Sequence, residues 1–218
     1  MKKFIIILFV SIALFNITGN ANHPSKELEA LVLKLEKISK QDDYIKLADE
    51  FKKVTENEKS NWLAFYYTAL CNAKVAWLRI ESDPENIEPF SSKASEFAKQ
   101  ALTMIDTAAQ RKEASEIYAV LSMAYRAYVY INPMTYGREY GTAAGRYTQL
   151  ARKFNPENPR ALFMEGWEKY ATPKAYGGNK AKAKELLESA RQKLSLNTSI
   201  GIAPHWGKTE IEDLLRKI

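Results

Sequence analysis

Apolar residues recur at intervals of three and four along most of this chain, which is the spacing of amphipathic α-helices. Leu28, Leu31 and Leu35 follow it in the first such stretch, and no stretch shows the sustained alternation of a half-buried strand. The 9 glycines and 8 prolines lie at the boundaries between stretches. We therefore predict an all-α protein of eight or nine helices. The predicted helices cover residues 25–39, 42–51, 58–80, 92–107 and 112–131, and others begin after Asn132, Asn158 and Asn179 and near Thr209.

Polar residues mark the starts of the later helices. Asn132 and Asn158 each precede a proline, which fits the first turn of a helix but not its interior, and Asn179 begins the eighth helix. Before the last, short helix, Thr209 and Glu212 have the spacing of a capping box, in which each side chain binds the other residue's backbone N–H. We expect that helix to begin near Thr209.

The N-terminal segment has a different pattern. Lys2 and Lys3 precede an apolar run of roughly 12 residues and then a small, polar stretch ending at Ala21, which is typical of a secretory signal peptide. Because a membrane-spanning helix needs about 20 apolar residues, cleavage after Ala21 is favoured over a retained anchor. We predict a signal peptide over residues 1–21 and a single helical domain over residues 22–218. The mature protein is expected to be soluble, periplasmic or otherwise exported, with no stable membrane span.

The amino-acid composition excludes several classes of site and partner. A single cysteine, Cys71, excludes an internal disulfide, so a packed core must stabilise the fold. The net charge is +6, but basic and acidic residues are interspersed, which argues against nucleic acid as a partner. The two histidines, His23 and His205, have no metal-ligand spacing with another His, Cys or paired carboxylate. We therefore expect no metal, no cofactor and no enzyme; catalysis would need titratable groups from separate helices to meet in one cluster.

Small residues at helical spacing indicate packed helical hairpins. In the tetratricopeptide repeat (TPR), small residues let two helices approach closely while large ones fill the adjoining holes. The windows that fit the first helix are residues 62–69, 118–125 and 162–166, and those that fit the second are residues 94–101, 144–151 and 183–190. These windows resemble a divergent TPR, which implies a TPR-like stack of hairpins. The stack would be irregular, because successive windows lie further apart than the repeat's period of about 34 residues.

The C-terminal half also resembles small exported TPR-like proteins of Bacteroidetes that have no assigned activity. The likeness depends mainly on Pro173, the Gly177-Gly178 pair and the segment Pro204–Lys208. A weaker similarity, confined to residues 173–190, is to the TPR-like periplasmic component of TRAP (tripartite ATP-independent periplasmic) transporters. It implies a lipophilic small molecule as ligand. The two glycines do not follow a strand, so we interpret them as a turn between helices rather than a phosphate loop.

Tyrosines are concentrated before the C-terminal hairpin. Seven of the 12 lie between Tyr118 and Tyr147, interleaved with arginines. Tyrosine combines apolar area with a hydroxyl and so suits both buried packing and a recognition surface. Aromatic residues at helical spacing belong more often to a core. If the segment is instead a groove, the predicted binding residues are Tyr125, Arg126, Tyr130, Tyr136, Arg138 and Tyr140.

Two functions are compatible with these features. The first, favoured by the sequence, is a non-enzymatic scaffold whose concave face binds a protein or peptide partner in the cell envelope. The alternative is a binder of a small lipophilic ligand in a pocket between helices. An open groove lined with polar groups would favour the scaffold, whereas an enclosed apolar cavity would favour the small ligand.

Overall fold

The computed structural model describes residues 25–196 and 201–218. Within these ranges it contains nine α-helices, two 3₁₀ turns and no strand, which confirms the predicted all-α class and number of helices. The predicted signal peptide, residues 1–21, and His23 lie outside the described residues. No helix in the described ranges is long and apolar enough to cross a membrane.

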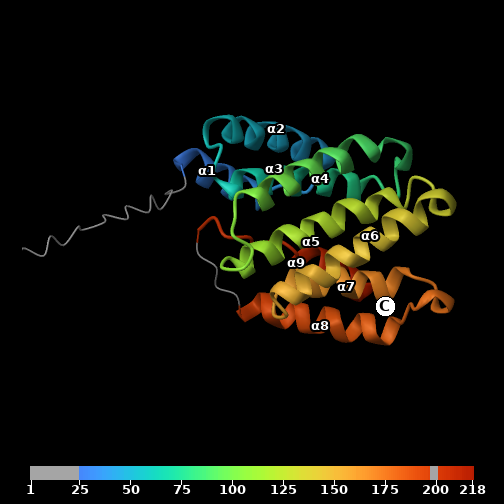
Figure 1. The fold of residues 1–218 in the computed structure, drawn as a ribbon. Coiled ribbons are helices and arrows are strands. Elements are labelled where there is room, and N and C mark those ends of the chain that lie inside the picture. Colours follow the sequence, from blue (N-terminus) through green and yellow to red (C-terminus); the bar gives the residue numbers. More distant parts are fainter. Residues whose placement is uncertain (1–24, 197–200) are drawn as a thin grey trace, which may run out of the picture.

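The helices form neighbouring hairpins. Each helix packs against the next one, and α3, α5 and α7 also contact one another in turn. The hairpins α3/α4, α5/α6 and α7/α8 therefore lie side by side, with α9 behind α5 and α7 in the view of Figure 1. The helices are α1 (Lys26–Leu35), α2 (Gln41–Asn57), α3 (Trp62–Leu78), α4 (Glu88–Thr103), α5 (Arg111–Tyr128), α6 (Pro133–Phe154), α7 (Pro159–Ala171), α8 (Lys180–Leu196) and α9 (Lys208–Arg216).

Asparagine caps explain where three helices begin. The side chains of Asn132, Asn158 and Asn179 each accept a hydrogen bond from a backbone N–H in the first turn of α6, α7 and α8, at 3.1, 2.9 and 3.0 Å. Such bonds satisfy N–H groups that have no partner inside the helix. All three predicted caps are confirmed.

The start of α4 differs from the prediction. The sequence suggested Ser92, because prolines precede it, but the helix begins at Glu88. Pro89 occupies the first turn, where its missing N–H would have no intrahelical partner and its fixed φ is already helical. The proline therefore opens this helix instead of delaying it.

The predicted capping box of α9 is wrong. The helix begins at Lys208, directly after Gly207, and no side chain caps it. Gly207 has a φ of +116°, a conformation that only glycine adopts without strain. Because the chain enters the helix through this glycine, Thr209 lies inside the first turn and cannot act as the cap.

Small residues let the hairpin helices approach closely. At Gly166 of α7, a Cβ would lie 3.0 Å from Leu187 Cγ and 3.3 Å from the Ala183 carbonyl oxygen, both on α8. At the turn between these helices, Gly177 has a φ of +93°, and a Cβ on Gly178 would overlap the backbone of Thr172. The interpretation of the glycine pair as a turn is confirmed.

We expect Gly166→Val to lower the free energy of unfolding by about 1–3 kcal/mol, because the new side chain must displace Leu187 in a closely packed contact. The matched control is Gly137→Val in α6, where a Cβ meets nothing within 4 Å. Both variants change helix propensity equally, so the control should stay within about 0.5 kcal/mol of wild type. Urea unfolding followed by circular dichroism measures both. Equal losses in the two variants would contradict the close approach of α7 and α8.

Candidate functional site

Seven aromatic rings form a continuous row over α5 and α6. Neighbouring ring centroids lie between 4.4 and 6.2 Å apart, within the range of favourable aromatic contacts. All but one of the residues are partly exposed. We call this row the aromatic ladder. Its members, in spatial order, are Phe154, Tyr118, Tyr147, Tyr125, Tyr128, Tyr140 and Tyr136.

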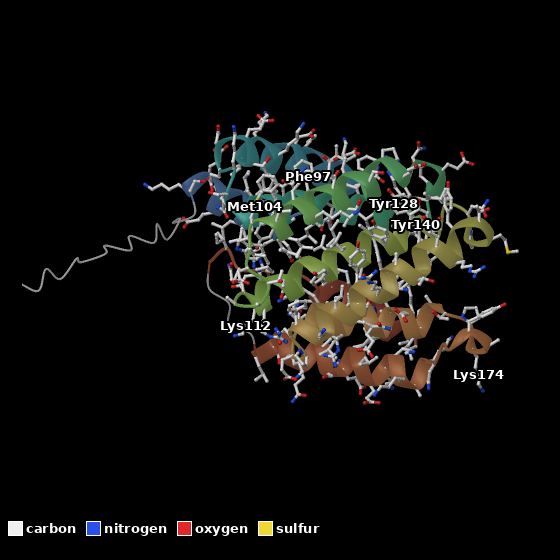
Figure 2. All side chains as sticks on the ribbon, viewed as in Figure 1. Phe97, Met104, Lys112, Tyr128, Tyr140 and Lys174 are labelled. Atoms are coloured by element: carbon white, nitrogen blue, oxygen red, sulfur yellow. The ribbon has the colours of Figure 1, made fainter. Side chains whose placement is uncertain are left out.

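The helix period explains why these rings meet. Within each helix the ladder residues are three, four or seven positions apart, so they share one face. The closest contact joins Tyr128 of α5 to Tyr140 of α6, whose rings are stacked with centroids 4.4 Å apart and an interplanar angle of 16° (Figure 2). Helix α4 borders the ladder, because Ser92 Oγ lies 2.6 Å from the Tyr128 hydroxyl.

The ladder side chains are themselves neutral, and cations lie beside two of them: Lys99 beside Tyr125 and Arg111 beside Phe154. Lys99 Nζ, from α4, donates a hydrogen bond to the Tyr125 hydroxyl at 2.9 Å and lies 5.4 Å from the centroid of that ring. This hydrogen bond raises the pKa of Lys99, so its ammonium stays charged at neutral pH. Burial raises the pKa of Tyr128, Tyr140 and Tyr147, so their hydroxyls stay neutral. The ladder therefore offers aromatic surface and neutral hydroxyls, with positive charges beside Tyr125 and Phe154.

The structure divides the six predicted binding residues between different surfaces. Tyr125, Tyr136 and Tyr140 belong to the ladder. Arg138 lies on the exposed side of α6, where it borders a shallow depression together with Glu139. The tyrosine-rich segment is thus partly a packed layer and partly a surface.

The other two predicted residues, Arg126 and Tyr130, face α7. Arg126 is buried, donates to Glu168 Oε2 at 2.7 Å and lies 5.3 Å from the centroid of the Trp167 ring. Tyr130 meets the same Trp167 edge to face, with centroids 5.8 Å apart. One residue step turns a helix by about 100°, so Arg126 cannot share the face of Tyr125.

The C-terminal segment, residues 201–218, contacts α3 and α7. The indole N–H of Trp206 donates to the Tyr66 hydroxyl of α3 at 2.7 Å, and its ring meets Phe163 of α7 at 6.5 Å. The Tyr67 hydroxyl donates to the Ile202 carbonyl oxygen at 2.6 Å. The chain's own C-terminal segment therefore covers part of the inner surface formed by α3, α5 and α7.

A buried ion pair supports this arrangement. Arg160 of α7 donates two hydrogen bonds to the Glu116 carboxylate of α5, at 2.5 and 2.7 Å, and the Arg160 side chain is 3 % exposed. The same guanidinium donates to the carbonyl oxygen of Trp206 at 3.4 Å. One arginine thus connects α5, α7 and the C-terminal segment.

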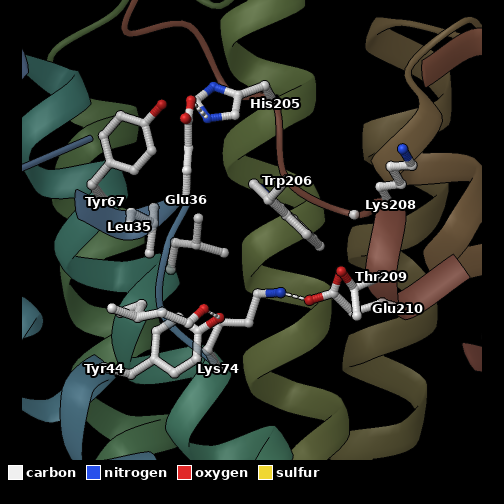
Figure 3. Close-up of a pocket in the computed structure, with 13 residues that line it drawn as sticks. Leu35, Glu36, Tyr44, Tyr67, Lys74, His205, Trp206, Lys208, Thr209 and Glu210 are labelled. Carbon is white, nitrogen blue, oxygen red and sulfur yellow. Dashed lines mark hydrogen bonds and ion pairs between the residues drawn. The ribbon is translucent and has the colours of Figure 1, made fainter. Parts of the chain in front are cut away.

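A pocket of about 200 Å³ lies between the C-terminal segment and helices α1–α3 (Figure 3). Its polar wall includes Lys74 of α3, which forms an ion pair with Glu210 of α9. The sequence analysis missed this pair, although Lys74 is the only charged residue between Trp62 and Leu78. A single lysine in an otherwise uncharged helix indicates a buried cation that needs an acidic partner, and this pattern could have been found in the sequence. Among the described residues, no group of three or more His, Cys, Asp or Glu side chains is placed to hold a metal ion.

Comparison with known proteins gives one informative match. No family model matches the chain, and a search of curated proteins finds no similar sequence. Among solved structures, the chain is similar to the HusA haemophore from Porphyromonas gingivalis. The two are 29% identical, with a TM-score of 0.76 and coverage of 87% of this chain and 90% of that one. P. gingivalis belongs to the Bacteroidetes, so the comparison supports the likeness to helical proteins of that group; it does not test the TPR assignment.

We expect Glu116→Gln to lower the free energy of unfolding by about 3 kcal/mol, because Arg160 would keep a buried charge without its carboxylate. The matched control is Glu50→Gln, which removes the carboxylate of an exposed pair with Lys34 and should cost at most about 1 kcal/mol. Chemical denaturation at neutral pH measures the difference. If Glu116→Gln were no more harmful than the control, the pair would not hold α5 and α7 together.

Proposed function

We propose that this protein is an exported, non-enzymatic carrier of a planar lipophilic ligand of the porphyrin class, bound at the aromatic ladder. The observation that carries the proposal is the row of seven aromatic rings across α5 and α6. The similarity to HusA supports the ligand class, since a haemophore is an exported haem-binding protein and the likeness extends over most of both chains. Of the two functions compatible with the sequence, this proposal develops the small lipophilic ligand.

Size favours the ladder over the pocket as the porphyrin site. Pockets that enclose drug-sized ligands have volumes of about 300–1,000 Å³. The pocket beside Lys74 has about 200 Å³, and it is bounded by the Lys74–Glu210 ion pair, the contact of His205 with Glu36, and Trp206. A macrocycle with side chains would have to displace the C-terminal segment to enter. The ladder extends over two helices and needs no such opening.

The chemistry of the ladder suits such a ligand. Aromatic side chains stack on flat π-systems, and the hydroxyls of Tyr136 and Tyr140 offer hydrogen bonds at its edge. The acidic side chains of a haem would meet the charged ammonium of Lys99 beside Tyr125 and the guanidinium of Arg111 beside Phe154. Stacking of the macrocycle on these rings is the expected source of affinity.

The assignment of the helical fold to the TPR-like class is also part of this proposal. We infer a divergent TPR-like array from the close approach at Gly166 and from the three hairpins placed side by side. In such an array the surface formed by α3, α5 and α7 is where an extended peptide would be expected. Here Trp206 and its neighbours already occupy part of that surface, so a peptide would have to compete with the chain itself. A protein or peptide partner stays a prediction.

The test is a titration of the full mature chain with haem, followed by absorption spectroscopy and by quenching of tryptophan fluorescence. We expect the double variant Tyr136→Ala/Tyr140→Ala to bind haem at least about tenfold more weakly, because two stacking partners are lost. The matched control is Tyr130→Ala, which removes a partly exposed tyrosine on the α7 side of α5. Its affinity should stay within about twofold of wild type.

Three outcomes would overturn the proposal. If the wild-type protein shows no saturable haem binding, the proposed porphyrin ligand class is wrong. The ladder is not the site if the ladder variant and the Tyr130→Ala control lose haem affinity equally while circular dichroism shows that both are folded. Binding that disappears only when the C-terminal segment is altered would assign the ligand to the inner surface instead.

A further inference from the structure

The pocket beside the C-terminal segment has the size of a single-ring ligand. Its volume is about 200 Å³. An apolar cavity of about 150 Å³ engineered in another protein binds benzene, so this pocket has room for one aromatic ring and a small substituent. The pocket lies between α1, α2, α3 and the start of α9, and none of the residues that line it belongs to the aromatic ladder. It is therefore a separate candidate site, and the argument for it does not depend on the proposed function.

The side walls of the pocket are apolar and aromatic. Leu35 and Tyr44 line it on the side of α1 and α2, and Tyr67 and Trp206 line it from α3 and the C-terminal segment (Figure 3). The hydroxyls of Tyr44 and Tyr67 donate to backbone carbonyl oxygens. Because these hydroxyls are already bonded, the rings present mainly their apolar surfaces to an occupant.

The charges at the two ends of the pocket differ in burial. At one end, His205 Nε2 lies 2.9 Å from Glu36 Oε1, and the Glu36 side chain is 45 % exposed. At the other end, Lys74 is only 8 % exposed and pairs with Glu210, which is 21 % exposed. The Lys74 ammonium also lies 5.0 Å from the centroid of the Trp206 ring. The most deeply buried charge that faces the pocket is thus positive, whereas the carboxylates lie nearer to solvent.

The negative charge near Lys74 comes from a single, replaceable side chain. Burial lowers the pKa of Lys74 to about 7, so its ammonium depends on a nearby carboxylate to stay charged at neutral pH. Its carboxylate partner, Glu210, belongs to the first turn of a nine-residue helix at the C-terminal end of the chain. A ligand carboxylate inside the pocket would form with Lys74 the ion pair that Glu210 forms now.

We propose that this pocket binds a small aromatic carboxylate, one ring in size, whose ring packs against Trp206 and Tyr67 and whose carboxylate binds the Lys74 ammonium in place of Glu210. The apolar walls select the ring, and the buried cation selects the acid. Binding is non-covalent, and the displaced Glu210 side chain turns toward solvent.

The experiment uses phenylacetate as the probe and the neutral phenylacetamide as its matched partner. On the full mature chain, titration calorimetry and ¹H–¹⁵N NMR of the tryptophan indole N–H groups measure binding, with the Trp206 signal assigned from Trp206→Phe. We expect a saturable shift of that signal with phenylacetate, and at least about tenfold weaker binding of phenylacetamide, because a hydrogen bond to a charged group is lost.

Three variants test the role of the cation. Glu210→Gln removes the competing carboxylate, so at pH 6, where the lowered pKa of Lys74 still favours its ammonium form, phenylacetate should bind about tenfold more tightly. Lys74→Met/Glu210→Gln removes the cation without leaving a buried charge unpaired, so phenylacetate should bind at least about tenfold more weakly than it binds wild type. The control Lys112→Met removes an exposed lysine of α5 and should leave the affinity within about twofold.

The proposal fails if the wild-type Trp206 signal does not respond to phenylacetate, a result that needs no variant to be folded. It also fails if phenylacetamide binds as tightly as phenylacetate, or if Glu210→Gln weakens binding in a chain that remains folded by circular dichroism. Haem titrations of the same variants report on the ladder separately, so failure of one site is distinguishable from failure of the other.

Discussion

The buried contact of Arg160 with Glu116 and with the Trp206 carbonyl oxygen is the constraint on which the arrangement of surfaces depends. It joins α5 of one hairpin and α7 of the next to the C-terminal segment. A buried guanidinium is tolerated only when its charge and its N–H groups find partners, so these three parts are positioned together. As a result, the inner surface of α3, α5 and α7 is partly filled by the chain itself.

Helix α5 separates two environments. One face carries Tyr118, Tyr125 and Tyr128 into the aromatic ladder, and the other faces carry Glu116 and Arg126 into buried ion pairs. The rings pack on α6 of the same hairpin and border α4, whereas the charges cross to α7. Because side chains rotate by about 100° per residue, a single tyrosine-rich stretch supplies both a surface and an interior.

The charged residues of the interior have a common feature. Lys74, Arg126 and Arg160 are all buried, and each has a carboxylate partner from another helix. The pairs differ in how firmly the acid is held. Glu116 is itself buried in the middle of the bundle, whereas Glu210 lies on the short terminal helix with a pocket beside it. A pair that borders a pocket can exchange its acid for a ligand, and a pair packed in the bundle cannot do so without exposing a charge.

The sequence alone determined the helical class, the number of helices and most of their starts, because these follow from local periodicity and from caps such as Asn132 and Asn158. It also identified the tyrosine-rich segment and the glycine turn before α8. It did not separate Arg126 and Tyr130 from the ladder, and it did not reveal the pairs of Lys74 with Glu210 or of Glu116 with Arg160. Those contacts join residues far apart along the chain, and local patterns contain no information on which distant helix supplies a partner. Only the packing of the hairpins decided which tyrosines face outward and which charges meet inside.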